Sequence, residues 1–461
     1  MNNLWFLTEE RPKIDVLVAI FEKFAKDRGF AVFIDAIRIF PILKNNEFTF
    51  TYEVTGFRCN KVDRVFIKTV SGNSSFTDYL IFYQEKEPVQ SDIPIYAIEE
   101  TKTDDSESRN TGVYQRCSKF VFIKHYYPEV KMIMLYNLQV AQKEKQTLTN
   151  LFGTRMLLTL GVEIMGKAEG PEVYTGFRTI DELIAFKEKM RQAPKGNVPI
   201  SIKKYADKII VTGRLYKSGG LSHDPNIGAL SLICSVLREL GWTKEIVIAN
   251  HGLRQEHVGA KNKFIQIANS LDIKLEGLTV PNAVRNESYW KYDLEGEKLG
   301  TIFIHLVVEN FTQGKSIYEN HAGCERGYFI TSKGEHLAIP KYMDREKYKN
   351  GDKEQIIFIP DLILQDIKRN EIINIEGKKY KYRLDGINEL KNYDYIEKHF
   401  ILKNYPAHTI VRTVVLYGSK EKQIFEVEVG FLLNESGQLI LGVKAPKLFH
   451  EAITNLLDFW K

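Results

Sequence analysis

The sequence predicts a mixed α/β (α+β) protein of 461 residues with two similar cores, each a central mixed sheet flanked by helices. Apolar or alternating segments of strand length occur in both the first and the last third of the chain. In each third a helical segment precedes a further strand, and two acids and a lysine stand on neighbouring strands. The length suits two or three domains, and 44% apolar residues can fill a core in each.

The first core begins with an amphipathic helix predicted over residues 13–26, in which apolar residues recur at helical spacing and Asp15 and Glu22 mark the solvent side. The helix that precedes the last strand is predicted at residues 114–122. We assign residues 1–190 to this N-terminal module. Its strands are predicted at residues 48–54, 65–69, 79–83, 93–98 and 131–136.

The chain becomes charged and rich in turn residues after this module, and we predict a linker at residues 191–208. A central region at residues 209–350 comes next. Its clearest elements are a helix at residues 225–240, ended by Gly241, and a strand at residues 245–249.

The last core, residues 351–461, repeats the order of the first. Its closing helix is predicted at residues 446–460, and a helix at residues 393–400 separates its earlier strands from its later ones. The match lies in the order of elements, not in residue identity. The strands are predicted at residues 355–359, 362–364, 371–375, 411–416, 424–432 and 439–443.

The bulk composition limits the choice of partners. The net charge is +5, so a site for a polyanion must come from local clustering of Lys and Arg. No leader peptide or membrane-spanning apolar run is visible, so we expect no membrane association. Four cysteines stand singly without a CxxC pair, which argues against a disulfide framework and a structural zinc site and favours reduced thiols in a cytoplasmic protein: Cys59, Cys117, Cys234 and Cys324.

The acids of the last core have the pattern of a magnesium site. Asp361 and Glu376 stand on adjacent predicted strands, and carboxylate oxygens suit Mg²⁺. Lys378 lies two residues beyond the second acid and therefore points to the same face of its strand. It can orient the attacking water and stabilise a pentavalent phosphorus. Asp366 and Glu371 are nearby acids that could take the place of either ligand.

The first core carries a similar set, with Asp78 as the first acid and Glu100 and Lys102 on the following strand. Glu99 is one residue away from Glu100. Since side chains alternate along a strand, we expect Glu100 to face the metal and Glu99 to face the opposite side. Two such sets in one chain predict two hydrolytic centres.

The sequence Pro360-Asp361, followed fifteen residues later by Glu376-Gly377-Lys378, resembles the PD-(D/E)xK signature of type II restriction endonucleases and their relatives. The resemblance implies two metal ligands followed by a catalytic lysine, and a Mg²⁺ cofactor that Mn²⁺ can replace.

The set in the first core resembles the same signature, with Thr77 in place of its proline. The resemblance gives the same roles to Asp78, Glu100 and Lys102. It also implies that the helix after the lysine strand carries polar residues toward the scissile phosphate. These DNA-binding candidates are Arg109, Gln115, Arg116 and Lys119.

Three loops supply further DNA-binding candidates. Residues 212–220 lack the order of a nucleotide phosphate loop, but they are consistent with a turn that lays cationic side chains against DNA phosphates, or with a plain surface loop. Residues 251–255 can read base edges in the major groove. Residues 320–328 lack the further ligands that a His/Cys metal site requires, which leaves a DNA-facing loop or a glycine-bearing turn. The side chains concerned are Arg214, Lys217, Arg254, Gln255 and Arg326.

We therefore expect a Mg²⁺-dependent, site-specific double-strand DNA endonuclease of restriction type, with one active site for each strand and a central DNA-recognition region at residues 209–350. Such a monomer would cut at a non-palindromic sequence, and a cognate DNA methyltransferase would be its functional partner. Three alternatives stay open: a homodimer with only the C-terminal site active, a structure-specific repair nuclease, and a non-catalytic DNA-binding protein.

Overall fold

The structure is a computed structural model, and the chain in it divides into two compact units. Unit 1 comprises Met1–Asn3, Glu10–Thr69 and Tyr292–Lys461, and unit 2 comprises Leu4–Glu9 and Val70–Lys291. Residues 10–69 thus group with the C-terminal part of the chain. The structure describes residues 1–72, 76–101, 112–136, 148–166, 175–191, 200–217, 220–221, 225–283, 288–292, 298–319, 328–418, 430–442 and 444–461.

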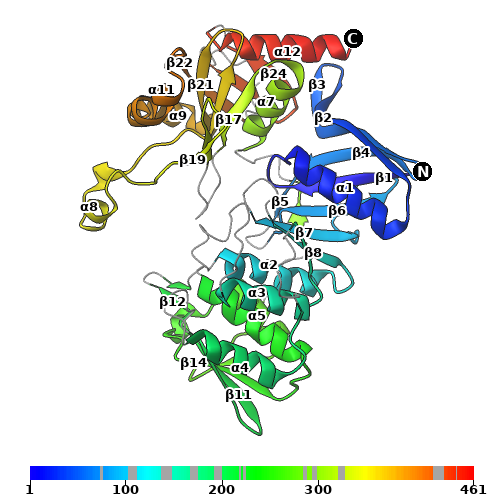
Figure 1. The fold of residues 1–461 in the computed structure, drawn as a ribbon, viewed down its shortest axis with the longest axis vertical. Coiled ribbons are helices and arrows are strands. Elements are labelled where there is room, and N and C mark those ends of the chain that lie inside the picture. The colour runs from blue at the N-terminus through cyan, green and yellow to red at the C-terminus, as the bar shows by residue number, and fades with distance from the viewer. Residues whose placement is uncertain are drawn as a thin grey trace. The chain divides into compact units, whose positions relative to one another are not determined.

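The main sheet of unit 1 has the strand order β17-β20-β21-β22-β23-β24 (Figure 1). Strand β20 is antiparallel to both β17 and β21, whereas β21, β22 and β23 run parallel. The strands are β17 (Lys315–Glu319), β20 (Leu362–Asp366), β21 (Glu371–Lys379), β22 (Thr409–Tyr417), β23 (Phe431–Leu433) and β24 (Leu439–Leu441).

Helices cover this sheet because each buries an apolar face against it. Helix α7 (Lys298–Phe311) is buried along most of its length and packs on β22, and α12 (Lys447–Phe459) packs on α7. After β21 come a 3-10 turn (Tyr380–Tyr382), α9 (Arg383–Glu389), a second 3-10 turn (Leu390–Asn392), α10 (Asp394–Ile396), a π-helical segment (Glu397–Ile401) and α11 (Leu402–Asn404).

A charge network around the buried Glu397 fixes the broken helical region onto the sheet. Arg412 on β22 donates through Nε to Glu397 at 2.8 Å and through Nη1 to the Leu390 carbonyl at 2.8 Å, and it also pairs with Asp394. Asn374 donates to the same Glu397 carboxylate at 2.7 Å. Glu397 is buried, so these hydrogen bonds offset the cost of removing its charge from water.

The first part of unit 1 is a helix and a long antiparallel sheet. Helix α1 (Ile14–Arg28) ends at Gly29, which adopts the left-handed conformation at φ 63°. Strands β2 (Val32–Lys44) and β3 (Glu47–Cys59) meet at Asn45 and Asn46, both at positive φ as a tight hairpin requires, and β4 (Val62–Thr69) pairs with β3. The hairpin contacts the C-terminal sheet region, where the Phe48 amide donates to the Gly437 carbonyl at 2.7 Å.

Unit 1 also contains an ion cluster and a small extension. Arg11 lies 3.0 Å from one carboxylate oxygen of Glu309, and His305 lies 3.0 Å from the other. Burial acts to raise the pKa of Glu309, but the charges of His305 and Arg11 outweigh it and lower this pKa to about 2. The extension between β17 and β20 contains β18 (Tyr328–Ile330), β19 (His336–Ala338), α8 (Arg345–Lys349) and a 3-10 turn (Lys353–Gln355).

Unit 2 contains a sheet with the strand order β1-β6-β7-β8-β9. Strands β6 and β7 are antiparallel and β7, β8 and β9 are parallel, so the order matches that of β17-β20-β21-β22-β23 in unit 1. The elements are β1 (Asn2–Thr8), β6 (Tyr79–Gln84), β7 (Tyr96–Thr101), α2 (Gly112–Tyr126), β8 (Lys131–Tyr136), α3 (Leu148–Thr159), β9 (Glu163–Met165) and α4 (Ile180–Arg191).

A second sheet of unit 2 has the order β10-β11-β14-β15, in which the last three strands are parallel. Helices α2, α3 and α5 pack on one another and lie between the two sheets (Figure 1). The elements are β10 (Ser201–Lys204), β11 (Lys208–Thr212), α5 (Pro225–Glu239), β14 (Glu245–Ala249), a 3-10 turn (Gln255–His257), α6 (Lys263–Ser270) and β15 (Ile273–Leu275). Two short ribbons, β12 (Tyr216–Lys217) with β13 (Gly220–Leu221) and β5 (Ser71–Gly72) with β16 (Trp290–Lys291), complete the unit.

The mixed α/β class, with mixed sheets flanked by helices, is confirmed, and most predicted elements are present within a few residues. The strand predicted at residues 355–359 is wrong, because Asp352 caps a 3-10 turn there and Ile356 makes only an isolated bridge to Tyr342. The helix predicted at residues 393–400 is split into α10 and a π-helical segment. Strand β2 was not predicted, since none of residues 32–38 is buried and its three buried residues are consecutive, so the strand shows little alternation. Residues 424–429 of the strand predicted at 424–432 lie outside the described residues.

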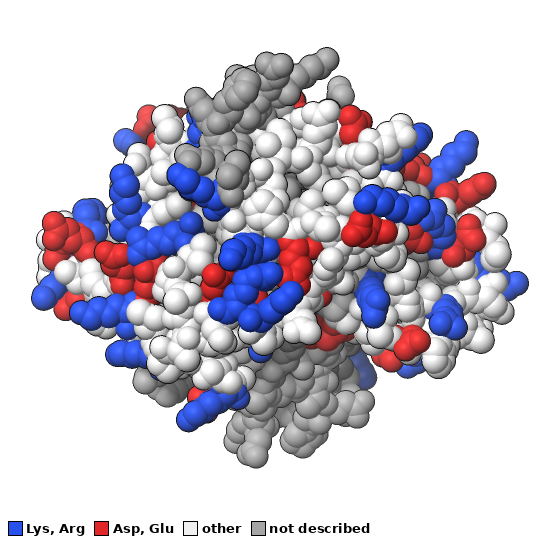
Figure 2. All heavy atoms as spheres, turned by 90° about the horizontal axis from the view of Figure 1, so that it is seen from above, with Lys and Arg blue, Asp and Glu red and all other residues white. Residues whose placement is uncertain are grey.

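Within the described part of the chain, no helix is long and apolar enough to cross a bilayer. On the face drawn in Figure 2, lysine and arginine side chains are interspersed with aspartate and glutamate. This mixture agrees with the small net charge of +5.

Candidate active sites

The first candidate site lies where β20 and β21 pair in unit 1. Leu362 pairs with Ile375, so the same antiparallel register places Asp361 opposite Glu376. Residues directly opposite each other in an antiparallel pair have side chains on the same face. The Gly377 amide donates to Asp361 Oδ2 at 2.9 Å, which ties the first acid to the second strand.

Lys378 and two helical residues complete this site. The Lys378 Nζ atom lies 2.5 Å from Glu376 Oε1 and 3.1 Å from Glu389 Oε2, and the Tyr393 hydroxyl donates to Glu376. Glu389 is the last residue of α9, and Tyr393 precedes α10. Sequence reasoning missed both residues, because neither stands at a fixed spacing from the acids.

The charged groups of this site shift one another's pKa values. Burial, the neighbouring charge of Asp361 and a hydrogen bond with Glu389 raise the pKa of Glu376 to about 8. Burial also acts to raise the pKa of Glu389, but hydrogen bonds with Glu376 and Lys378 hold it below its usual range. Partial burial opposes the charged form of Lys378, yet the hydrogen bonds and charges of Glu376 and Glu389 raise its pKa. Near neutral pH Glu376 is therefore largely protonated, while Glu389 is ionised.

Two glycines let the neighbouring helices approach this site. A Cβ atom on Gly377 would stand 2.4 Å from Thr301 Oγ1 of α7, so this position faces α7. A Cβ atom on Gly386 of α9 would stand 2.9 Å from Lys378 Cγ. Helix α9 thus packs directly on the lysine stem, and the two faces of β21 are covered by different helices.

The second candidate site lies at the equivalent strand pair of unit 2. Tyr79 pairs with Ile98, so the register places Asp78 opposite Glu99. The Asp78 amide donates to Glu99 Oε2 at 3.2 Å, and the Glu100 amide donates to Asp78 Oδ2 at 2.7 Å. The second contact matches that of Gly377 with Asp361 in unit 1. Glu99 therefore corresponds to Glu376 by position in the strand pair.

The expectation that Glu99 points away from Asp78 is wrong. The Lys119 Nζ atom of α2 lies 2.6 Å from Glu99 Oε1 and 3.7 Å from Asp78 Oδ1, which places both acids on one side. Glu100 is buried, and strand alternation turns its side chain to the other face, as at Gly377. Thr101 occupies the position that corresponds to Lys378. Lys119, a DNA-binding candidate from the sequence, thus supplies the cation of this pair.

A second lysine lies close to this site. Lys263, the first residue of α6, is half-buried, and its Nζ atom lies 5.9 Å from the centre of the Phe122 ring on α2. Burial, followed by the positive charge of Lys119, lowers the pKa of Lys263 to about 7, while Glu99 opposes the change. No sequence pattern indicated this residue, because it is far from the acids along the chain.

The remaining candidates lie in several environments. Arg214 and Arg254 are exposed, and Arg254 pairs with Glu256 at 2.7 Å. The Gln255 side chain makes two hydrogen bonds with the Thr279 backbone, which occupy its amide group. Lys102, Arg109 and Arg326 lie outside the described residues, and the side chains of Gln115, Arg116 and Lys217 are not described.

Neither substitute acid of the last core lies at the candidate site. Asp366 is buried and accepts a hydrogen bond from Arg369 at 2.7 Å, at the far end of β20 from Asp361. Glu371 pairs with Asp366 across the strands and so lies at the same far end.

The donor set of unit 1 is suitable for a hard divalent cation. Two carboxylates face each other across β20 and β21, and their mutual repulsion contributes to the raised pKa of Glu376. A cation between Asp361 and Glu376 would relieve that repulsion. Among the described residues no group of three His, Cys, Asp or Glu side chains is arranged to hold a metal, which leaves two carboxylates with water and phosphate oxygens, a set that Mg²⁺ accepts.

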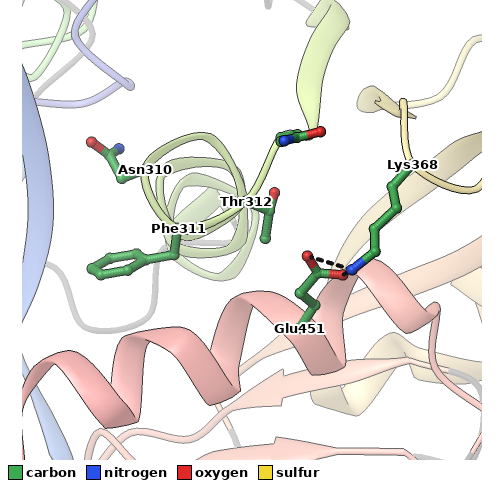
Figure 3. A pocket seen from close by; sticks show the side chains of 6 residues that line it. Asn310, Phe311, Thr312, Lys368 and Glu451 are labelled. Carbon is green, nitrogen blue, oxygen red and sulfur yellow. Dashed lines mark hydrogen bonds and ion pairs between the residues drawn. The ribbon is translucent and has the colours of Figure 1, made fainter.

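A surface hollow of about 550 Å³ lies elsewhere on unit 1, at the C-terminal end of α7 (Figure 3). Lys368 and Glu451 approach each other there at 3.3 Å, and Arg369 also pairs with Glu451. The hollow lies beyond the end of β20 that is remote from Asp361. Its charged groups are paired with one another, and we assign it no function.

No family model, no curated protein and no solved structure matches this chain. The functional assignment therefore depends on the arrangement of side chains in the two units.

Proposed function

We propose that this chain is a Mg²⁺-dependent, site-specific DNA endonuclease of restriction type, with one hydrolytic centre in each unit. One observation carries the proposal: the same strand pair occurs twice, with an acid opposite a glutamate and a backbone amide bound to the first acid. A cation lies beside each glutamate, Lys378 in unit 1 and Lys119 in unit 2. Two independent occurrences of one arrangement argue for a shared chemical role.

In unit 1, Asp361 and Glu376 would hold the metal ion, which when bound neutralises phosphate charge and lowers the pKa of a coordinated water. Lys378 lies beside Glu376 and would donate to a non-bridging phosphate oxygen or orient the attacking water. A water oxygen bonds to phosphorus as the bond to the 3′ oxygen breaks. The water proton passes to solvent and the 3′ oxygen takes up a proton, which leaves 5′-phosphate and 3′-hydroxyl ends.

In unit 2, Asp78 and Glu99 would hold the metal, and Lys119 would take the part of the strand lysine. This assignment replaces Glu100 and Lys102, because the strand register pairs Asp78 with Glu99. Two different centres in one chain favour a monomer that cuts both strands at a non-palindromic site. A DNA methyltransferase with the same specificity would then protect the host DNA.

The test is cleavage of supercoiled plasmid with Mg²⁺ or Mn²⁺, with nicked and linear products resolved. We expect Lys378→Ala and Lys119→Ala each to nick, and only the wild type to linearise. The matched controls are Lys379→Ala, the next residue on β21, and Lys124→Ala on α2, which should both linearise. Lys102→Ala should linearise as well if Lys119 is the functional cation.

Other outcomes identify the alternatives. If Lys378→Ala is inactive while Lys119→Ala still linearises, only the C-terminal site cuts, and a homodimer is required. Cleavage confined to junctions or ends would indicate a structure-specific repair nuclease. Specific DNA binding without cleavage under any divalent cation would contradict the proposal and indicate a non-catalytic DNA-binding protein.

A further inference from the structure

Helix α6 connects the second sheet of unit 2 with the candidate site of the same unit. It leads into β15 of the β10-β11-β14-β15 sheet, and its first turn packs against α2, the helix that carries Lys119. Asn262 caps α6 by accepting a hydrogen bond from the Phe264 amide at 2.9 Å. The cap fixes the start of the helix, and with it the position of Lys263.

Helix stability does not explain a lysine at this position. The N-terminal end of a helix carries a partial positive charge, so a cation in the first turn is unfavourable. Lys263 is half-buried, and the positive charge of Lys119 acts on it as well. Lys119 already pairs with Glu99 at 2.6 Å, and the charge of the same carboxylate also acts on Lys263.

With a divalent cation on Asp78 and Glu99, the charges of Lys119 and Lys263 would no longer be balanced by these acids, which suits an anionic substrate. A phosphodiester has two non-bridging oxygens, and one can face the metal ligands while the other accepts from a lysine. Lys263 is carried by α6 and Lys119 by α2, so the two lysines would contact a phosphate from different helices.

We propose that Lys263 is a phosphate-binding residue of the N-terminal centre. It lies on α6, the helix before β15 of the second sheet, and would hold the DNA backbone against Asp78 and Glu99. The proposal rests on the proposed nuclease function. It makes the second sheet part of the substrate site of unit 2.

The kinetic test uses the full chain with Lys378→Ala, so that nicking reports the N-terminal centre alone. We expect Lys263→Met to raise KM about tenfold, to change kcat by less than about threefold, and to lower the slope of affinity against salt by about one charge. Lys263→Arg should restore most of the affinity. Lys189→Met, an exposed lysine on α4 of the same unit, is the matched control and should leave all three values unchanged.

A binding measurement separates this proposal from the nuclease proposal. Affinity of the full chain for a fluorescent duplex is measured in Ca²⁺ by anisotropy, with and without Lys263→Met, and thermal unfolding of each variant checks the fold. Loss of affinity and of salt slope with an unchanged unfolding temperature supports the role of Lys263, even if no variant cleaves DNA.

Equal affinity and equal salt slope for Lys263→Met and wild type would overturn it. If Lys263→Met unfolds early, Lys263→Gln and Lys263→Arg are compared. A loss of DNA affinity in Lys263→Gln that is largely restored in Lys263→Arg supports phosphate binding. An equal loss of affinity in both variants contradicts it.

Discussion

Glu376→Gln tests whether ionisation of Glu376 lowers the free energy of unfolding of unit 1. The pKa of Glu376 is raised from 4.5 to about 8, with burial as the largest cause. The unfolded chain loses this proton above pH 4.5, whereas the folded chain keeps it until about pH 8. Folding stability therefore falls as the pH rises through this interval. Glutamine cannot ionise, and its amide can donate as the protonated glutamate does, so the variant should escape the loss.

The magnitude follows from the size of the pKa difference. One pKa unit corresponds to about 1.4 kcal/mol. The hydrogen bond with Glu376 lowers the pKa of Glu389, which offsets part of the cost, so we expect a gain of about 2–4 kcal/mol in the free energy of unfolding at pH 8. At pH 4.5 the gain should be close to zero. Because the chain has two units, hydrogen exchange of β20 and β21 in the full chain is a better assay than one global unfolding curve.

The control for this experiment is Glu371→Gln, on the same strand and outside the site. Slower exchange in Glu376→Gln than in the wild type at pH 8, with no such difference at pH 4.5, supports the reasoning, and Glu371→Gln should match the wild type at both pH values. An equal difference between Glu376→Gln and the wild type at both pH values would refute it. Addition of Mg²⁺ should protect the wild type more than the variant, since binding to the acid pair favours the folded state.

Three further changes test other parts of the structure. Gly386→Ala should raise helix stability by up to about 1 kcal/mol but displace the Lys378 stem, so nicking by the C-terminal centre should fall about tenfold while the unfolding temperature holds. Glu309→Gln should lower the free energy of unfolding by about 1–3 kcal/mol at pH 7. This difference should disappear as the pH falls from 4.5 toward 2, because ionised Glu309 stabilises the fold only above its folded-state pKa. Urea unfolding of both proteins across this pH range measures the difference. Arg412→Met should cost about 3–5 kcal/mol by leaving the Glu397 carboxylate short of partners, and Glu397→Gln in the same chain should recover part of that loss in a double-mutant cycle.

The local pattern of apolar residues predicted many elements well. Strands β8 and β14 begin and end at the predicted residues, and helices α1, α5 and α12 lie within two residues of their predicted limits. These segments bury one continuous face or lie wholly in a core, so their periodicity is strong. The failures lie where local hydrogen bonding overrides periodicity, as at Asp352, or where buried and exposed residues do not alternate, as in β2.

The acids of the two sites show where spacing along the sequence predicts which side chains face each other and where it does not. In unit 1 the strands are joined by a short turn, with Asn370 at positive φ, and Asp361, Glu376 and Lys378 come together as predicted. In unit 2 the connection between β6 and β7 is longer, and the predicted pairing was wrong by one residue. A one-residue change of register moves a side chain to the other face, so Glu99 takes the position expected for Glu100.

The sequence by itself determined the α/β class, the repeated order of strands and helices, and the presence of two sets of acids and lysines on which the proposed hydrolase depends. Those properties depend on composition and on spacing within one segment. The tertiary structure alone decided which acid faces Asp78 and which cations lie near the pair, because the helices that carry Lys119 and Lys263 approach the acids only when the chain folds. Glu389 and Tyr393 join Glu376 for the same reason. Such contacts depend on register and on helix placement, which no local pattern specifies.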